Sequence, residues 1–172
     1  MDEIDLAKRA KKHDTQAFLL LMDLYKETLY RTAFSFLKNE HDAIEALQEV
    51  TVRAYKKIHT VKEPKYMKTW LVRIMMNYCQ DQLKYKQRFT FSQELYEIEA
   101  ELNFTHLEIE EALSKLPDAG QRLIHLKYFQ DVKNKDIAVS ENIPEGTVKS
   151  RLHHALKALR KYLSEEGESD HV

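Results

Sequence analysis

The chain has 172 residues, of which 43% are hydrophobic and 32% are charged. This length allows one domain or two small ones, and the 3 Gly and 3 Pro are few enough to favour a mostly helical fold. The apolar runs are too short to span a membrane, and the charged first residues are unlike a signal peptide. The single cysteine, Cys79, excludes an internal disulfide and fits a reducing cytosol, so we expect a cytoplasmic protein with a packed core thiol.

The net charge of −1 conceals three blocks of different sign. Residues 1–88 hold 17 Lys and Arg against 12 Asp and Glu, whereas residues 89–118 hold 1 against 8. Residues 119–163 hold 9 against 4. Two basic blocks on either side of an acidic one indicate two nucleic-acid-facing modules joined by an acidic connector. The competing interpretation is a surface of mixed charge with an accidental fluctuation.

The apolar spacing in the first block predicts four helices. A short amphipathic helix is expected over 6–12 and a long one over 15–37. A third helix, from Asp42 to about Ile58, is expected to bury Ile44, Leu47, Thr51, Ala54, Tyr55 and Ile58. A polar loop over 59–68 leads to a fourth helix, which we expect to begin with Thr69 as its N-cap and to run to about Tyr85.

The rest of the chain resumes a helical pattern after an acidic stretch without a strong period. Leu116-Pro117 marks a boundary, because the residue before a proline avoids helical angles, and an amphipathic helix is expected over 118–129. The polar residues at the end of the chain are expected to be disordered.

Residues 136–162 have the pattern of a helix-turn-helix. A short helix around 136–139 precedes a turn at 142–144, and a longer helix runs from about Glu145 to Tyr162. Asn142 is expected to adopt a positive φ, which Asn tolerates better than most residues, and Pro144 stands where a helix needs no N–H donor. One face of the second helix is apolar: Val148, Leu152, Ala155, Leu156, Leu159 and Leu163.

The opposite face of that helix carries side chains of the types that reach base edges and phosphates in a major groove: Thr147, Lys149, Ser150, His153, His154 and Lys157. This pattern predicts DNA binding. The alternative is an amphipathic helical hairpin with a solvated polar face.

Sequence patterns typical of enzymes are absent. The chain has no HExxH or CxxC spacing, no glycine-rich phosphate loop and no GxSxG elbow. We therefore expect neither catalysis nor a cofactor nor a metal site.

Two separated stretches resemble a known family. DAIEALQEVTVRAYKKI (42–58) and KTWLVRIMMNYCQDQLK (68–84) resemble the region-two domain of bacterial RNA polymerase sigma factors. ALSKLPDAGQRLIHLKYFQDVKNKDIAVSENIPEGTVKSRLHHALKALRKYL (112–163) resembles their region-four domain. With no region-three domain between them, the whole chain is similar to the extracytoplasmic-function (ECF) group.

The resemblance implies an all-α protein of two small domains. It places the region-two bundle at 1–88, an acidic linker at 89–108, the region-four helix-turn-helix domain at 109–166 and a disordered tail at 167–172. Within the helix-turn-helix, two positions depart from the family pattern: Asn142 stands where a Gly is usual, and Glu141 where an apolar residue is usual.

The resemblance also implies roles for individual residues. The side chains facing the clamp helices of core polymerase would be Asp42, Glu45, Gln48 and Glu49. The −10 element would be bound and melted by Lys62, Lys65, Tyr66, Lys68, Trp70, Arg73 and Asn77, with Trp70 either in the core or on DNA. The −35 element would be read by Thr147, Lys149, Ser150, His153, His154 and Lys157, with Arg151 as a phosphate contact.

The implied partners are core RNA polymerase, promoter DNA and an anti-sigma factor, with no small-molecule substrate and no direct membrane insertion. Two other interpretations remain open at this point. One is a helix-turn-helix regulator with an N-terminal sensor or dimerisation domain, and the other is a helical adaptor that does not bind DNA.

Overall fold

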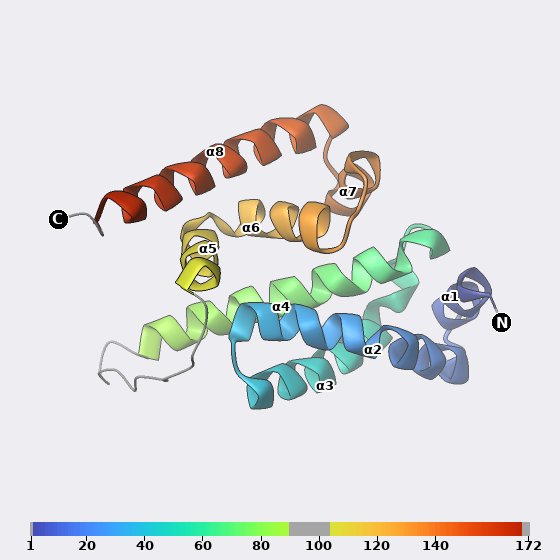
Figure 1. The fold of residues 1–172 in the computed structure, drawn as a ribbon. Helices are drawn as coiled ribbons and strands as arrows, with labels where there is room; N and C mark the ends of the chain where they lie inside the picture. Colours follow the sequence, from blue (N-terminus) through green and yellow to red (C-terminus); the bar gives the residue numbers. More distant parts are fainter. Residues whose placement is uncertain (1, 90–103, 170–172) are drawn as a thin grey trace. The chain divides into compact units, whose positions relative to one another are not determined.

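The computed structural model describes residues 2–89 and 104–169 of the chain. All regular structure in these residues is helical, which confirms the expected all-α class (Figure 1). The chain divides into two compact units, Met1–Glu94 and Leu95–Val172. Among the described residues, none of the helices combines the length and the hydropathy needed to cross a membrane.

The first unit is a bundle centred on α2. Its helices are α1 (Glu3–Lys11), α2 (Thr15–Leu37), α3 (Glu40–Lys57) and α4 (Met67–Phe89). Two short 3-10 turns, η1 (Ile58–Thr60) and η2 (Pro64–Tyr66), connect α3 to α4. Because α2 packs against the other three helices, its buried stripe supplies much of the core. Cys79 is fully buried in this core, as expected, and burial raises the pKa of its thiol to about 12.

Local hydrogen bonds explain why α2 and α3 begin where they do. The Asp14 carboxylate accepts a hydrogen bond of 3.0 Å from the Ala17 amide at the start of α2. The Asn39 side chain accepts one of 2.9 Å from the Asp42 amide at the start of α3. These caps satisfy amides that a helix leaves without an intrahelical partner. Residue 38, between the two helices, has a left-handed backbone with φ of 55°.

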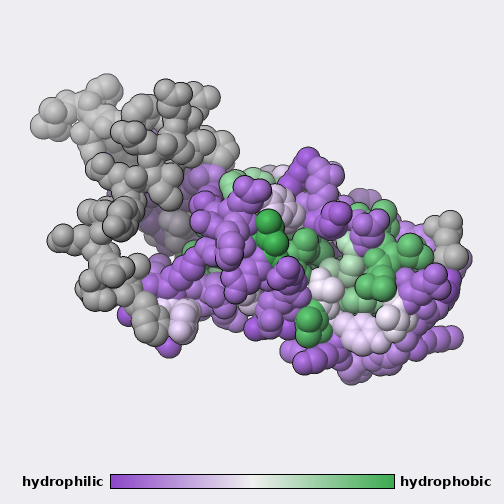
Figure 2. All heavy atoms as spheres, turned by 90° about the horizontal axis from the view of Figure 1, so that it is seen from below, coloured by the Kyte–Doolittle hydropathy of each residue, from purple (hydrophilic) through white to green (hydrophobic). Residues whose placement is uncertain are grey.

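The predicted buried face of α3 is partly wrong. Ala54 and Ile58 are buried, but Ile44 is 45% exposed and Tyr55 is 36% exposed. The side chains that α3 buries along its length are Ala43, Ala46, Val50 and Ala54. Small side chains let α3 lie close to its neighbours, and the larger apolar ones are left at the surface. Figure 2 shows one face of the molecule, which is mostly hydrophilic with a few hydrophobic areas.

The predicted start of α4 is also wrong. The helix begins at Met67, so Thr69 lies inside its first turn and is not the N-cap. The 3-10 turn η2 precedes it directly, with Pro64 at its first position. The proline ring fixes φ near a helical value, which brings the chain into helical geometry before Thr69.

The described part of the second unit contains four helices and one π-helical turn. The helices are α5 (Phe104–Lys115), α6 (Asp118–Ile124), α7 (Asn134–Glu141) and α8 (Glu145–Ser169), and the π-helical turn η4 (His125–Phe129) continues α6. The helix expected over 118–129 therefore changes type in its last five residues. Helix α5 begins at Phe104 and α8 ends at Ser169.

Helix α8 packs against α5, α6 and α7. The contact centres on Leu116, Ile124 and Ala155, which are buried together, with Leu156 and Tyr162 at the edge of the cluster. The core of this unit thus lies along one side of α8 and leaves its other side in solvent.

Candidate nucleic-acid and protein interfaces

The helix-turn-helix turn has the geometry that the sequence predicts. Asn142 adopts a positive φ of 55°, which confirms the expectation for this residue. Its amide donates to the Val139 carbonyl at 3.3 Å, and the Ile143 amide donates to the Ala138 carbonyl at 3.0 Å. This pair of bonds is the Schellman ending of a helix. It turns the chain within two residues, and the Pro144 carbonyl then accepts hydrogen bonds from the amides of Thr147 and Val148 in the first turn of α8.

The first half of α8 has one buried apolar face and one exposed polar face, as the sequence predicts. Val148, Leu152 and Ala155 are buried, and Leu156 is partly buried. The exposed side chains are Lys149, Ser150, Arg151, His153, His154 and Lys157, whereas Thr147 is partly buried. The cationic and hydroxyl side chains therefore stand on a rigid helix that its own apolar stripe anchors.

Glu141 shows how the chain accommodates one departure from the family pattern. Its carboxylate lies 3.9 Å from the Arg122 guanidinium, and the side chain of Glu141 is only 10% exposed. The ion pair joins α6 to the end of α7. Sequence reasoning flagged Glu141 but missed Arg122, because the two residues are 19 positions apart and no local spacing relates them.

The acidic side chains of α3 form an exposed group. Glu45, Gln48 and Glu49 are exposed, and the Arg53 guanidinium donates to the Glu49 carboxylate at 2.9 Å. Asp42 differs from them: it is partly buried, and the Lys86 ammonium of α4 pairs with its carboxylate. The four residues thus share a helix, but Asp42 reaches solvent less than the other three.

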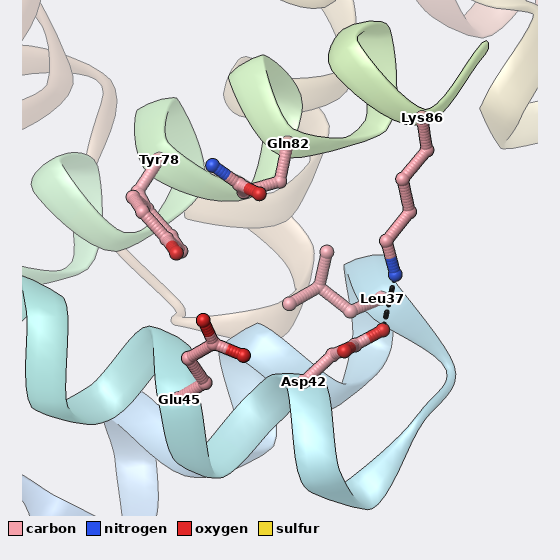
Figure 3. Close-up of a pocket in the computed structure, with 6 residues that line it drawn as sticks. All are labelled: Leu37, Asp42, Glu45, Tyr78, Gln82 and Lys86. Atoms are coloured by element: carbon pink, nitrogen blue, oxygen red, sulfur yellow. Dashed lines mark hydrogen bonds and ion pairs between the residues drawn. The ribbon is translucent and has the colours of Figure 1, made fainter. Parts of the chain in front are cut away.

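A small hollow lies between α3 and α4 beside these residues. Its lining consists of Leu37, Asp42, Glu45, Tyr78, Gln82 and Lys86. Figure 3 shows Glu45 and Tyr78 facing each other across it, with Lys86 reaching to Asp42. Burial, followed by the nearby carboxylates of Glu45 and Glu49, raises the pKa of the Tyr78 phenol, so this group stays a neutral hydrogen-bond donor. Sequence reasoning missed Lys86 and Tyr78 here.

The loop expected over 59–68 is more ordered than a polar loop suggests. It contains η1 and η2, and Lys62 is exposed between them. The Lys65 ammonium lies 3.2 Å from the Glu63 carboxylate and 5.0 Å from the centre of the Tyr66 ring. These contacts, first the hydrogen bond to Glu63, raise the pKa of Lys65. Lys65 and Tyr66 thus present a cation and a ring side by side.

Three of the expected −10 residues share one face of α4. Trp70, Arg73 and Asn77 are three and four positions apart, which places them in line along a helix. Trp70 and Arg73 are partly buried and Asn77 is exposed, so the Trp70 indole is neither fully in the core nor fully in solvent. Lys68 is exposed in the first turn but does not share their face.

Comparisons with known proteins agree on one family. A model of sigma-70 region 2 matches residues 21–89, and a model of sigma-70 region 4 matches residues 106–159. The chain is 33% identical to the RNA polymerase sigma factor SigV of Bacillus subtilis, with 91% of this chain and 97% of that protein covered. It is 31% identical to the ECF RNA polymerase sigma factor SigW of the same bacterium, over 91% and 94%.

Solved structures show the same fold at lower sequence identity. The structure of CnrH in complex with the cytosolic domain of CnrY matches with a TM-score of 0.68 and 21% identity, covering 95% of this chain and 97% of that one. The sigma factor RpoE of Bartonella quintana, in complex with the anti-sigma factor NepR, matches with a TM-score of 0.59 and 21% identity, covering 89% and 98%.

Proposed function

Since this chain belongs to the ECF group of RNA polymerase sigma factors, we propose that it binds core RNA polymerase and directs it to promoters through a −10 and a −35 element. The observation that carries this proposal is the division of α8 into a buried apolar stripe and an exposed polar one. In this proposal the chain positions polymerase on DNA and performs no covalent chemistry.

The −35 element is assigned to α8. Lys149 and Ser150 in its first turns, and His153 and His154 one turn later, can approach base edges once the helix enters a major groove. Arg151 is assigned to phosphate, where its charge fixes the position of the helix without reading sequence. The remaining members of the set are Thr147 and Lys157.

The −10 element is assigned to the loop after α3 and to the exposed face of α4. Taking a base out of the stack costs a few kcal/mol, so the protein must hold both the base and the strand that carries it. Tyr66 with Lys65 offers a ring and a cation for this purpose, and Lys62 and Lys68 add cations nearby. Trp70, Arg73 and Asn77 on α4 are assigned to the melted strand.

The polymerase contact is assigned to Asp42, Glu45, Gln48 and Glu49 of α3. Glu45 and Glu49 are exposed carboxylates one turn apart, as an acidic helix face for a protein partner requires. We also propose an anti-sigma factor as inhibitor, on the analogy of the RpoE complex. The cytoplasm, where core polymerase acts, is the proposed location.

Transcription in vitro tests this function directly. The chain and core RNA polymerase should together transcribe a defined subset of a random promoter library, and core polymerase alone should not. A subset that shares one −35 and one −10 motif supports the proposal. Co-purification with core polymerase distinguishes a sigma factor from both an adaptor and a conventional helix-turn-helix regulator. Failure to bind core polymerase would overturn the proposal.

A further inference from the structure

Gly146 lies in the first turn of α8, in the middle of the face assigned to the −35 element. Helical spacing puts it in line with Ser150 four residues later and with His153 seven residues later. Lys149, three residues after the glycine, lies beside this line. All four positions are exposed. The polar face of α8 therefore begins with a position that carries no side chain.

The backbone of α8 does not require a glycine at this position. Gly146 does not have a positive φ, so the left-handed conformation that favours glycine is not the reason for its presence. Within a helix, glycine is less favourable than alanine because it loses more backbone freedom on folding. The residue thus lowers the stability of α8 and serves no need of its backbone.

The packing of the protein does not require a glycine there either. Among the described residues, no atom beyond its own turn of helix lies within 4 Å of the place that a Cβ atom of residue 146 would take. Gly120 in α6 differs: a Cβ atom there would lie 3.6 Å from the Ala155 Cβ and 3.9 Å from the Leu116 Cβ. The space at Gly120 thus borders the core of the unit, whereas the space at Gly146 opens to solvent.

A glycine that neither the backbone nor the packing requires fits a place where another molecule approaches the backbone closely. A recognition helix presents its N-terminal residues to base edges in the major groove. A Cβ atom at residue 146 would stand about 1.5 Å out from its Cα, towards the floor of that groove. Lys149 and Ser150 must reach base edges in the same groove, so the distance of the helix from the bases decides whether they can.

We propose that Gly146 is a positioning residue, which sets how deeply the start of α8 enters the major groove of the −35 element. The backbone at Gly146 lies against the edges of the base pairs, and this close approach brings Lys149 and Ser150 to their bases. A side chain at position 146 lifts the start of the helix and lengthens these contacts. The proposal rests on the proposed function, because it needs α8 to bind a −35 element.

The test separates stability from promoter binding in variants of the full chain. Gly146→Ala adds one methyl group to the polar face, and Gly146→Leu adds a larger side chain that is also a good helix former. Gly120→Ala is the matched control, because it makes the same substitution in another helix of the unit, at distances of ordinary van der Waals contact. Holoenzyme with each variant is titrated onto a promoter from the random library and onto the same promoter with a scrambled −35 element.

Gly146→Ala and Gly120→Ala should both raise Tm, by about 2–8 °C, because alanine is the better helix former. Only Gly146→Ala should weaken binding to the intact promoter, by about 5- to 150-fold, which is the range for the loss of one good base contact. Gly146→Leu should weaken it further. Binding to the scrambled promoter and to core polymerase should stay at the wild-type level. A merely structural role for the glycine would not combine a higher Tm with weaker promoter binding.

Four outcomes contradict this role of Gly146. If Gly146→Ala binds the intact promoter as the wild type does while Lys149→Ala changes the −35 preference, the close approach is absent and the proposed function stands. If neither variant alters binding to the −35 element, the role of Gly146 and the assignment of α8 both fail. A lower Tm together with weaker binding would show that the glycine serves the fold. An equal loss on intact and scrambled promoters would show that its effect does not depend on the −35 element.

Discussion

The exposed side chains on α8 are expected to divide into those that read bases and those that hold phosphates. Lys149 and His154 are exposed on the side of α8 away from Val148, so truncation should spare the core. Lys149→Ala and His154→Ala should each cost about 1–3 kcal/mol against one preferred base and relax the −35 preference there. Arg151→Ala should weaken all promoters alike. Holoenzyme transcription over every single-base variant of the −35 element measures this, and a uniform loss for Lys149→Ala and His154→Ala would exclude both from base reading.

The pH dependence of the second unit should follow His125. This ring is 6% exposed and stacks on Phe129 with centres 5.2 Å apart, and burial lowers the pKa of the imidazole to about 4. An unfolded histidine titrates near about 6.5, so between these values the unfolded state binds a proton that the folded state does not. Stability should therefore fall as the pH drops from about 6.5 towards 4.

The variant His125→Leu removes this group and should flatten the curve of Tm against pH in that range. Carboxylates contribute to acid unfolding of both proteins, so the difference between the two curves isolates the imidazole. Parallel curves for wild type and variant would contradict the assignment.

The exposed acids of α3 are expected to act together as one contact surface for core polymerase. Glu45→Lys with Glu49→Lys should sharply weaken binding to core polymerase, because it reverses the face assigned to the partner. The loss of the Glu49–Arg53 pair should cost only about 0.2–0.5 kcal/mol, so Tm should change little. Asp23→Lys with Glu27→Lys changes the same number of exposed acids on α2 and serves as control. Core affinity that survives the α3 reversal would refute this face.

The ion pair between α6 and α7 is expected to contribute to the stability of the second unit. Glu141→Leu alone should lower Tm, because it leaves the partly buried Arg122 without its carboxylate. Arg122→Met with Glu141→Leu replaces both partners with apolar groups and should recover most of the loss. A thermal melt of the four proteins forms a double-mutant cycle, and additive losses would show that the two residues do not interact.

The sequence predicts helices better than it predicts which faces they bury. The bounds of α2, Thr15–Leu37, agree with the prediction, because a continuous apolar period and the Asp14 cap define them. The buried face of α3 differs from the prediction. The small side chains of Ala43 and Ala46 are buried there, because close packing of the helices matters more than the hydrophobicity of each side chain. The position of Lys86 beside Asp42 results from the packing of α4 on α3. These helices are far apart in the sequence, so no local spacing reveals the pair. The site residues on α8 follow from its period, but their roles stay predictions.

The whole molecule is expected to depend on its polymerase for promoter binding. Residues 1–88 and 119–163 each carry a net charge of only +5, so each module neutralises few phosphates. Affinity for DNA falls steeply with salt even for proteins that make six to ten phosphate contacts, roughly 10³-fold or more between 50 and 200 mM. Free protein should therefore bind promoter duplex weakly at physiological salt, and core polymerase should supply the remaining contacts.

Promoter binding with and without core polymerase is the decisive test of this dependence on polymerase. A labelled promoter recovered from the random library is titrated with the chain alone, with core polymerase alone and with both, at physiological salt. Sequence-specific binding and opening of the −10 region should occur only when both proteins are present. Tight, sequence-specific binding by the free chain, with no gain from core polymerase, would contradict it.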